Sequence, residues 1–372
     1  YIVVLKQSAA QPVLTRQLRS ENRLQKLQMN QVARNGNLTK LKQVHGKGGI
    51  QETAIQHYFA DAVVGFTAKM SKGQADVLRR DPDVEGIFQD MAYILEPILL
   101  EPIKLISTQT VTCAVEMAGG PLDGSTKPTW IWICDTGIDL DHPDLNVQTS
   151  ATYAKSFVPG QTIEDGHGHG THCAGIAAAK NNLFGVAGVS AGATVVPVKV
   201  LDNTGHGQFS WLLAALNYIA TVDISGDVVS MSLGGYPVSN CVNYWPPLTA
   251  AIQNLGNAGT SVVIAAMNES DCNGANLSLP GCVNGNRVYT VGAITCNKTC
   301  ADYSNFGPAV VDWVAVGSSV YSTYKNGGYA TLSGTSMATP VVAGIIHSKN
   351  GAPPVSGGVV VCCNAQYKIA HR

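Results

Sequence analysis

From about residue 128 onward the sequence alternates short, fully apolar runs with alanine-rich stretches. The apolar runs are "TWIWICD", "TVVPVKVL", "DVVSMSL", "SVVIAAMN" and "VYTVGAIT". Because they lack the polar alternation of a strand with one face in water, they predict parallel strands buried on both faces. Stretches such as "HGTHCAGIAAAK" and "SWLLAALNYIATV" predict the intervening helices. We therefore expect an α/β domain with a mostly parallel sheet flanked by helices, and a functional site at the carboxyl ends of its strands.

The first 95 residues follow a different pattern, with strand-like and helix-like stretches in the order β-α-β-β-α-β. The stretches are "YIVVLK" (strand), "QPVLTRQLRSENRLQKLQMNQVARNG" (helix ending at Gly36), "HYFADAVVGFTAKM" (two strands), "SKGQADVLRRDPDV" (helix capped by Ser71 and stopped at Pro82) and "EGIFQDMAYIL" (strand). This order predicts a small α+β domain of the ferredoxin-like type over residues 1–95.

Residues 96–107 connect this domain to the main domain, which we place at residues 108–372. The connecting stretch contains two Glu-Pro pairs, and the residue before a proline favours extended backbone. We therefore expect residues 96–107 to form an extended linker.

Charge and hydropathy exclude several partners. The formal net charge is −1, which gives no reason to expect a nucleic-acid or anionic-membrane partner. The longest apolar runs are far shorter than the roughly 20 residues that a membrane-spanning helix needs. The chain opens directly on "YIVVLK", so we expect that any targeting segment has been removed.

Ten cysteines indicate an oxidising, extracellular location. Most lie in polar, turn-rich loops such as "CNKTC" and "DCNGANLSLPGC", which favours disulfides that close short loops, and we predict a Cys272–Cys282 bridge. Cys134 and Cys173 lie in apolar or alanine-rich runs and are expected to be small buried side chains. The protein is therefore expected to be secreted.

Three polar residues stand at the positions where a parallel sheet collects a site. Asp135 ends the strand "TWIWICD", His169 opens the helix "HGTHCAGIAAA", and Ser336 opens the helix of "LSGTSMATPVVAGIIH". A serine hydroxyl becomes a nucleophile when a base takes its proton, and a third group must orient that base. Serine, histidine and aspartate can supply these three roles.

Five blocks of this sequence resemble the subtilisin-like serine proteases, in the order that the family has them. The blocks are "ICDTGIDLDHPDL", "HGHGTHCAG", "VVSMSLGG", "AAMNES" and "LSGTSMATP". The resemblance covers roughly residues 108–350, and "HGTHCAG" is closest to the proteinase K-like branch. The first 95 residues resemble the family's propeptide, which is an intramolecular chaperone and inhibitor.

The resemblance implies a secreted serine endopeptidase that acts on proteins and peptides and is made as an autoprocessed zymogen. Its own propeptide would bind at the active site, and cleavage would fall within residues 105–109, near Ser107–Thr108. We expect the protein to be a monomer.

The same resemblance assigns roles to individual residues. Ser336 would be the nucleophile, His169 the general base, Asp135 its orienting partner and Asn268 a side-chain donor of the oxyanion hole. The residues that line the substrate site would be Ser232, Leu233, Gly234, Gly235, Ala266 and Met267.

The sequence departs from the family at three places. Met267 stands where the family has glycine, which would narrow the primary specificity pocket. Val341 replaces the histidine that usually follows "SMATP", which we interpret as a packing change. The family's last helix is expected to be replaced by a strand in "SGGVVVCCNAQYKIA".

Structural calcium is the cofactor that the resemblance implies. "QTVTCAV" is similar to the mature amino terminus of true subtilisins, and "AAKNNLFGVAGV" has the length of their calcium loop. Carried over residue by residue, the ligands would be side-chain oxygens of Gln109, Asp144 and Asn182 and carbonyl oxygens of Lys180, Phe184 and Val186. An all-oxygen set suits a hard cation.

Two other functions remain open from the sequence. His167, His169 and His172 could bind zinc in a metal-dependent hydrolase, although there is no H-E-x-x-H motif and no obvious fourth ligand. Without a metal role, His172 is expected to be a buried, hydrogen-bonded helix residue. Alternatively, the chain could be a non-catalytic protein whose first domain binds and inhibits proteases.

Overall fold

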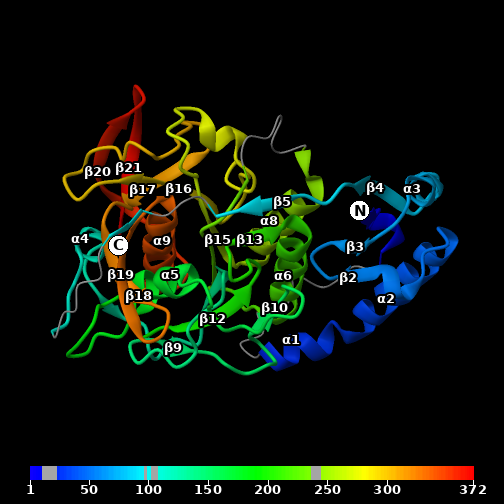
Figure 1. The fold of residues 1–372 in the computed structure, drawn as a ribbon, viewed down its shortest axis with the longest axis horizontal. Helices are drawn as coiled ribbons and strands as arrows, with labels where there is room; N and C mark the ends of the chain where they lie inside the picture. Colours follow the sequence, from blue (N-terminus) through cyan, green and yellow to red (C-terminus); the bar gives the residue numbers. More distant parts are fainter. Residues whose placement is uncertain (11–22, 96–98, 102–107, 236–243) are drawn as a thin grey trace.

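The computed structural model describes residues 1–10, 23–95, 99–101, 108–235 and 244–372. The main domain is built on a ten-stranded sheet in the order β10-β12-β8-β14-β15-β16-β17-β21-β20, with β9 also paired to β12 (Figure 1). These strands are β8 (Ile131–Asp135), β9 (Asn146–Val147), β10 (Lys155–Ser156), β12 (Thr194–Lys199), β14 (Val228–Met231), β15 (Ser261–Ala265), β16 (Val288–Ile294), β17 (Val311–Val316), β20 (Val355–Cys362) and β21 (Ala365–His371). All neighbours pair in parallel except β20 and β21, so the predicted fold class is confirmed.

Helices cover both faces of this sheet. The helices are α4 (Cys113–Met117), α5 (His169–Ala178), α6 (Phe209–Val222), α8 (Pro246–Ala258) and α9 (Thr335–Ser348). The side chains of Ile131 and Ile133 in β8 pack with α5 and α9, whereas those of Trp132 and Cys134 pack with α6 and α8. This alternation buries both faces of a central strand, which is why the strand sequences are apolar throughout.

The amino-terminal domain is a four-stranded antiparallel sheet in the order β2-β3-β1-β4, covered by helices, which matches the predicted ferredoxin-like order (Figure 1). Its strands are β1 (Ile2–Leu5), β2 (Ile55–Ala60), β3 (Val64–Ala68) and β4 (Val84–Phe88), and its helices are α1 (Arg23–Met29), α2 (Gln31–Lys47) and α3 (Lys72–Leu78). Ser71 caps α3 in a reciprocal capping box with Gln74, as the sequence predicts for the start of this helix.

The predicted end of the charged helix at Gly36 is wrong, because α2 continues to Lys47. Beyond Gly36 the helix places Leu41 and Val44, both fully buried, in the core of the small domain. A glycine inside a helix costs about 1 kcal/mol relative to alanine, whereas each buried aliphatic side chain contributes about 1.5–3 kcal/mol. Tertiary burial therefore outweighs the local signal.

Two further strands bring the end of the small domain and the connecting segment onto the main domain. The predicted strand over residues 85–95 is two strands, β4 and then β5 (Ala92–Ile94), and β5 pairs antiparallel with β13 (His206–Gln208) of the main domain. Within the predicted linker, β6 (Leu99–Glu101) pairs antiparallel with β19 (Gly328–Ser333), which itself pairs with β18 (Val320–Tyr324). The predicted cleavage segment at 105–109 begins within residues 102–107, which lie outside the described residues.

The remaining short elements complete the main domain and the connecting turns. They are β7 (Leu122–Asp123), which pairs with β11 (Ser190–Ala191), and the 3₁₀ helices Gln7–Ala9, Glu52–Ala54 and Gly274–Leu277. The segment "SGGVVVCCNAQYKIA" forms the hairpin of β20 and β21 rather than the single strand that the sequence suggests. Among the described residues, no helix is both long and apolar enough to cross a bilayer.

The disulfides join segments that are distant in the sequence. Cys113 pairs with Cys296, Cys272 with Cys363, and Cys300 with Cys362. The predicted Cys272–Cys282 bridge is therefore wrong, and "CNKTC" closes no short loop. The last two of these bonds tie loops of the main domain to the β20–β21 hairpin. Cys134 and Cys173 are buried free thiols, as predicted.

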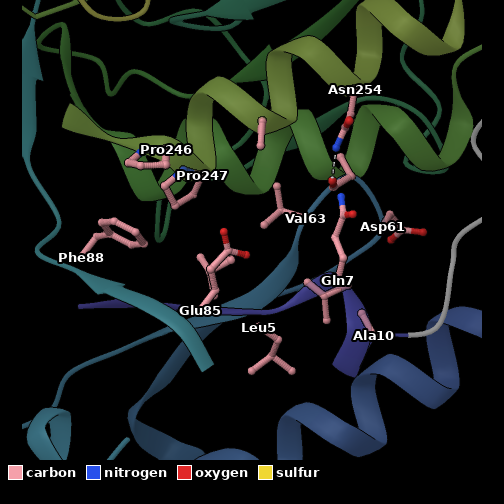
Figure 2. A pocket seen from close by; sticks show the side chains of 14 residues that line it. Leu5, Gln7, Ala10, Asp61, Val63, Glu85, Phe88, Pro246, Pro247 and Asn254 are labelled. Atoms are coloured by element: carbon pink, nitrogen blue, oxygen red, sulfur yellow. Dashed lines mark hydrogen bonds between the residues drawn. The ribbon is translucent and has the colours of Figure 1, made fainter. Parts of the chain in front are cut away.

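A cavity of about 430 Å³ lies between the small domain and helix α8. Figure 2 shows Leu5, Val63 and Glu85 of the small domain on one side and Pro246 and Pro247 on the other. At its rim the Asn254 side chain donates to the Ala62 carbonyl oxygen at 2.7 Å. This cavity is a local gap in the contact, because the small domain shares one buried apolar cluster with α6 and α8. Its members in that cluster are Ile2, Val4, Phe59, Ala62 and Val63.

Candidate active site

The loop before α5 is organised around the buried carboxylate of Asp165. This carboxylate accepts hydrogen bonds from the backbone amides of Gly168 and Thr171 and from the Thr136 hydroxyl. Gly168 adopts a φ of +108°, and a β-carbon there would lie 2.4 Å from the Tyr324 ring. Only glycine fits this position, and the turn delivers His169 to the first position of α5.

His169 lies against Asp135 at the carboxyl end of β8. The His169 Nδ1 atom donates to Asp135 Oδ1 at 2.7 Å, and the two side chains are 0% and 1% exposed. Burial lowers the pKa of His169, but the Asp135 carboxylate and the hydrogen bond to it outweigh burial and hold this pKa well above the ordinary 6.5. Its Nε2 atom is buried and has no partner among the described residues. The imidazole is therefore oriented by one nitrogen and open for proton transfer at the other.

Ser336 lies in the first turn of α9. Its hydroxyl donates to the Ser232 carbonyl oxygen at 3.3 Å, and the Ser232 hydroxyl donates back to the Ser336 carbonyl oxygen at 2.8 Å. The Cys173 sulfur connects the two sequence-predicted residues, because it lies 4.0 Å from His169 Nδ1 and 3.5 Å from the Ser336 carbonyl oxygen. Asp135, His169 and Ser336 thus share one neighbourhood at the carboxyl edge of the sheet.

Asn268 follows β15 and is held by the residue before the serine. Its Oδ1 atom accepts from the Thr335 backbone amide at 2.8 Å and from the Thr335 hydroxyl at 3.0 Å. A β-carbon added at Gly334 would lie 3.6 Å from the Ser336 backbone nitrogen and 3.7 Å from Asn268 Nδ2. Two nitrogen donors therefore border the space that the missing side chain of Gly334 leaves open.

The three histidines of the alternative zinc site do not come together as a ligand set. His172 Nε2 lies 3.1 Å and 3.0 Å from the carbonyl oxygens of Val320 and Ala330, and burial lowers the pKa of His172 to about 3. His172 is thus the buried, hydrogen-bonded helix residue that the alternative interpretation expects. In the described part of the chain, the ligand atoms of Asp135, His169 and Cys173 lie within 4.8 Å of one another. Burial raises the pKa of Cys173, which disfavours the thiolate that a zinc site requires.

Comparison with known proteins decides between these interpretations. The subtilase family matches residues 126–349, and the peptidase inhibitor I9 family matches residues 1–96. The chain belongs to the subtilase family. This subtilase is a serine endopeptidase that carries an inhibitor-type amino-terminal domain, and the non-catalytic and metal-dependent alternatives are not favoured.

Several proteases are similar in sequence to this chain, over different lengths. The alkaline serine protease ver112 of Corniculantispora psalliotae is 34% identical over 322 residues, which cover 82% of this chain and 76% of the relative. The cuticle-degrading protease of Metarhizium anisopliae is 34% identical over 302 residues, 77% of this chain and 71% of the relative. Subtilisin amylosacchariticus of Bacillus subtilis subsp. amylosacchariticus is 40% identical over 214 residues, 57% of this chain and 52% of the relative.

A solved structure agrees with the fold of this subtilase. A cold adapted subtilisin-like serine proteinase superposes with a TM-score of 0.52 at 31% sequence identity, over 62% of this chain and 79% of that chain. The family resemblance stated from the sequence is therefore confirmed.

The predicted substrate residues of the subtilase lie along the end of β14 and after β15. Ser232, Leu233 and Ala266 are buried, and Gly235 exchanges two backbone hydrogen bonds with Leu279, at 2.8 and 3.0 Å. A peptide strand therefore cannot use the amide and carbonyl groups of Gly235 without displacing Leu279.

Met267 adjoins Gly234. A β-carbon added at Gly234 would lie 2.9 Å from the Met267 sulfur. Met267 has a φ of +76°, a conformation that glycine adopts at no cost and other residues adopt at about 1–3 kcal/mol. Glycine would adopt this backbone conformation without strain, whereas the Met267 side chain lies against Gly234.

The predicted calcium residues gather around the buried Asp144. Gln109 Nε2 donates to the Lys180 carbonyl oxygen at 3.0 Å, and Asn182 Nδ2 donates to Asp144 Oδ1 at 2.8 Å. The Val186 backbone amide donates to Asp144 Oδ2 at 2.9 Å, and the Phe184 amide donates to Asn182 Oδ1 at 2.9 Å.

The donor set around Asp144 fits a calcium ion. Burial raises the pKa of Asp144, and no ion pair to its carboxylate is found within the described ranges. A rotation of the Asn182 amide by about 180° would turn its oxygen toward this carboxylate, and the same rotation of Gln109 would turn its oxygen toward the Lys180 carbonyl oxygen. The site thus offers carboxylate, amide and carbonyl oxygens, which are the ligands that calcium prefers.

The sequence missed three residues of the site. Thr335 fixes Asn268, Asp165 organises the loop before His169, and Cys173 fills the space between His169 and Ser336. Cys173 lies inside the quoted "HGHGTHCAG" and Asp165 lies two residues before it, so adjacency to the motif was the signal that could have found them.

Proposed function

We propose that this subtilase hydrolyses peptide bonds with Ser336 as nucleophile, His169 as general base and acid, and Asp135 as the group that orients His169. Ser336 attacks the scissile carbonyl carbon while His169 Nε2 takes the hydroxyl proton, and the protonated imidazole then gives that proton to the leaving amine. The single observation that supports this assignment most strongly is the 2.7 Å bond between buried Asp135 and His169, which leaves His169 Nε2 without a partner among the residues that the structure describes.

The oxyanion would be held by Asn268 Nδ2 and the Ser336 backbone amide. Thr335 already holds Asn268 through its oxygen, so the amide nitrogen is oriented before substrate arrives. Preorganised donors of this kind contribute about 3–4 kcal/mol each to transition-state stabilisation. We propose that Ser232, Leu233 and Gly234 line the substrate cleft with Ala266, and that Met267 narrows the primary pocket toward small side chains.

Intact mass over time tests the triad directly. The purified chain and its Ser336→Ala variant are incubated in calcium, with Ser356→Ala as a control that removes an exposed serine hydroxyl. We expect the wild type and the control to shed an amino-terminal fragment and to react with a serine-directed phosphonate, whereas Ser336→Ala does neither. Processing of the Ser336→Ala chain at the wild-type rate would overturn the assignment.

The amino-terminal domain would act as an inhibitor until it is cut and released. In support, β5 pairs with β13 and β6 pairs with β19, whose last residue Ser333 is three positions before Ser336. We propose cleavage within residues 105–109. The fragment mass checks this position, since a product that ends between Leu95 and Leu99 would instead place the cut between these two strand pairs.

We propose that calcium binds at Gln109, Asp144 and Asn182 with the carbonyl groups of Lys180, Phe184 and Val186. A bound ion would supply positive charge next to the buried Asp144 and tie the 180–186 loop to Gln109. Asp144→Asn is expected to abolish the gain in thermal stability on adding calcium, whereas Asp141→Asn, at an exposed position of the same loop, keeps it. An unchanged calcium response in Asp144→Asn would contradict this site.

We propose that the enzyme is secreted and acts as a monomer on protein and peptide substrates. Three disulfides that join distant segments support an oxidising compartment. Reduction by a thiol at neutral pH is expected to lower the thermal midpoint, and light scattering of the purified chain reports the oligomeric state.

A further inference from the structure

Two basic side chains of the amino-terminal domain are buried inside the main domain, at the end of the sheet opposite the active site. They are Arg23 and Lys26 of α1, and their carboxylate partners are Asp227 and Asp223. Asp227 directly precedes β14, whereas Asp135 ends the neighbouring β8. A strand of five residues is about 16 Å long, so this contact is separate from the catalytic groups.

Arg23 occupies a complete guanidinium receptor. Its two terminal nitrogens donate to the Asp227 carboxylate at 2.5 and 2.8 Å, and to the carbonyl oxygens of Val222 and Pro128 at 3.2 and 3.1 Å. The guanidinium carbon lies 3.6 Å from the centroid of the Trp130 ring. Bidentate pairing, carbonyl acceptors and an aromatic face together recognise the shape of arginine as well as its charge.

Lys26 occupies an adjoining ammonium site. Its amino group donates to the Asp223 carboxylate and, at 3.1 Å, to the Asp223 carbonyl oxygen. The second oxygen of this carboxylate accepts from the Thr260 hydroxyl. Arg23 and Lys26 are three positions apart on α1, so they share one face of the helix and enter the two sites together.

The main domain supplies hydrogen bonds to these carboxylates but not their counter-charges. Asp227 also accepts from the Trp130 amide, the Trp132 indole and the Ile224 amide, at 2.9, 2.9 and 3.1 Å. Within the described part of the main domain, no lysine or arginine forms an ion pair with Asp223 or Asp227. Both carboxylates therefore depend on the other domain for charge compensation.

We propose that Asp223 and Asp227, with Trp130 and the carbonyls of Pro128 and Val222, form a binding site for paired basic side chains, which holds the amino-terminal domain independently of the active site. The ligand class is a helical segment with the spacing Arg-x-x-Lys. This inference rests on the proposed role of that domain as an inhibitor. The anchor adds a polar contact to the apolar one that the sheet of the small domain makes with α6 and α8. After processing, the site remains on the mature domain, open to basic side chains of other chains.

The first test needs no catalysis and uses the full Ser336→Ala chain. Hydrogen exchange is compared between this chain and the same chain with Arg23→Ala and Lys26→Ala. The matched control carries Lys42→Ala and Arg79→Ala, which remove two exposed cations of the same domain. We expect the Trp130 and Ile224 amides to exchange at least ten-fold faster in the anchor variant and unchanged in the control. Equal exchange in all three chains would overturn the proposal.

The second test uses the catalytically competent chain without any mutation at the site. The time from processing to full peptidase activity is measured with added agmatine, which carries a guanidinium and an ammonium group, against sodium chloride of equal ionic strength. We expect agmatine to shorten this lag several-fold in the wild type and to have no more effect than salt in the Arg23→Ala, Lys26→Ala chain. Agmatine and salt acting equally on the wild type would overturn the proposal.

The two tests separate failure of the anchor from failure of the proposed function. If the wild type never becomes active while the anchor variant still exchanges faster, then the anchor stands and the zymogen assignment fails. If activity appears, but neither exchange nor the agmatine response distinguishes the variants, then the anchor alone is wrong.

Discussion

The two ends of the central strands carry buried aspartates with different partners. At the carboxyl end, Asp135 pairs with His169 of its own domain, and the pair lies 34 positions apart in the chain. At the amino end, Asp227 pairs with Arg23 of the amino-terminal domain, 204 positions away. The comparison teaches that the contact proposed for catalysis is internal to the main domain, whereas the proposed anchor crosses the domain boundary and would be lost on release of the amino-terminal domain.

The largest expected effect is a loss of activity on substitution of Asp135, at the carboxyl end of the central strands. Asp135→Asn is expected to lower kcat by about 10⁴-fold, because the amide no longer fixes the tautomer of His169 or stabilises its cation. Peptide hydrolysis by the matured enzyme measures this loss. Asp312→Asn, in strand β17, is the control and should change kcat little. A comparable loss in both variants would remove the distinction between Asp135 and a carboxylate elsewhere in the sheet.

Substitution of Asp227, at the amino end of the central strands, is expected to lower stability rather than catalytic activity. Asp227→Asn leaves Arg23 buried without its counter-charge, which should lower the free energy of unfolding of the uncut Ser336→Ala chain by about 3–5 kcal/mol. Urea unfolding measures the change. Asp76→Asn breaks an exposed ion pair with Arg79 and should cost about 0–1 kcal/mol. If the two substitutions lower the free energy of unfolding equally, then the buried ion pair contributes no more to stability than the exposed one.

Substitution of Asn268 tests whether a residue at the carboxyl end of the strands, other than Asp135 and His169, contributes to catalysis. Asn268→Ala should lower kcat by about 10²–10³-fold with a small change in KM, since the oxyanion exists only after attack. Asn297→Ala, at an exposed loop position, provides the comparison. A rise in KM at constant kcat would indicate ground-state substrate binding instead.

The pH dependence should follow His169 alone. The base must be neutral to accept the serine proton, and its pKa is held above 6.5, so activity should be low at pH 6 and rise as pH increases through that pKa. The slope should approach ten-fold per pH unit below the midpoint. His172 does not titrate in this range, because its pKa is lowered to about 3. A midpoint below 6.5 in kcat against pH would show that burial outweighs the Asp135 charge.

The sequence predicted the fold and the neighbourhood of the site because both depend on short segments. Asp135 ends an apolar strand, and His169 and Ser336 each begin an alanine-rich helix. In a parallel sheet such positions meet at one edge, so periodicity alone brings them together. Residue roles came from the five-block resemblance, because periodicity does not distinguish a catalytic serine from a helix cap.

Two of the failed predictions depend on packing between segments that are distant in the chain. Cys272 lies ten positions from Cys282 but pairs with Cys363, since β20 and β21 fold back beside its loop. The local sequence predicts a helix end at Gly36. Helix α2 nevertheless continues beyond it, because this buries Leu41 and Val44. Local signals of about 1 kcal/mol are too weak to resist such packing.

By itself, the sequence determined the parallel sheet, the two-domain order and the segments that carry Asp135, His169, Asn268 and Ser336, because strand burial, helix starts and motif spacing are local properties. Tertiary structure alone decided that Thr335 holds Asn268, that Cys272 joins Cys363, and that Arg23 meets Asp227. Such pairs form between residues 67 to 204 positions apart, and the cost of closing a chain loop grows only slowly with its length. Spacing therefore carries little information about them, and the packed geometry of the folded chain selects the partner.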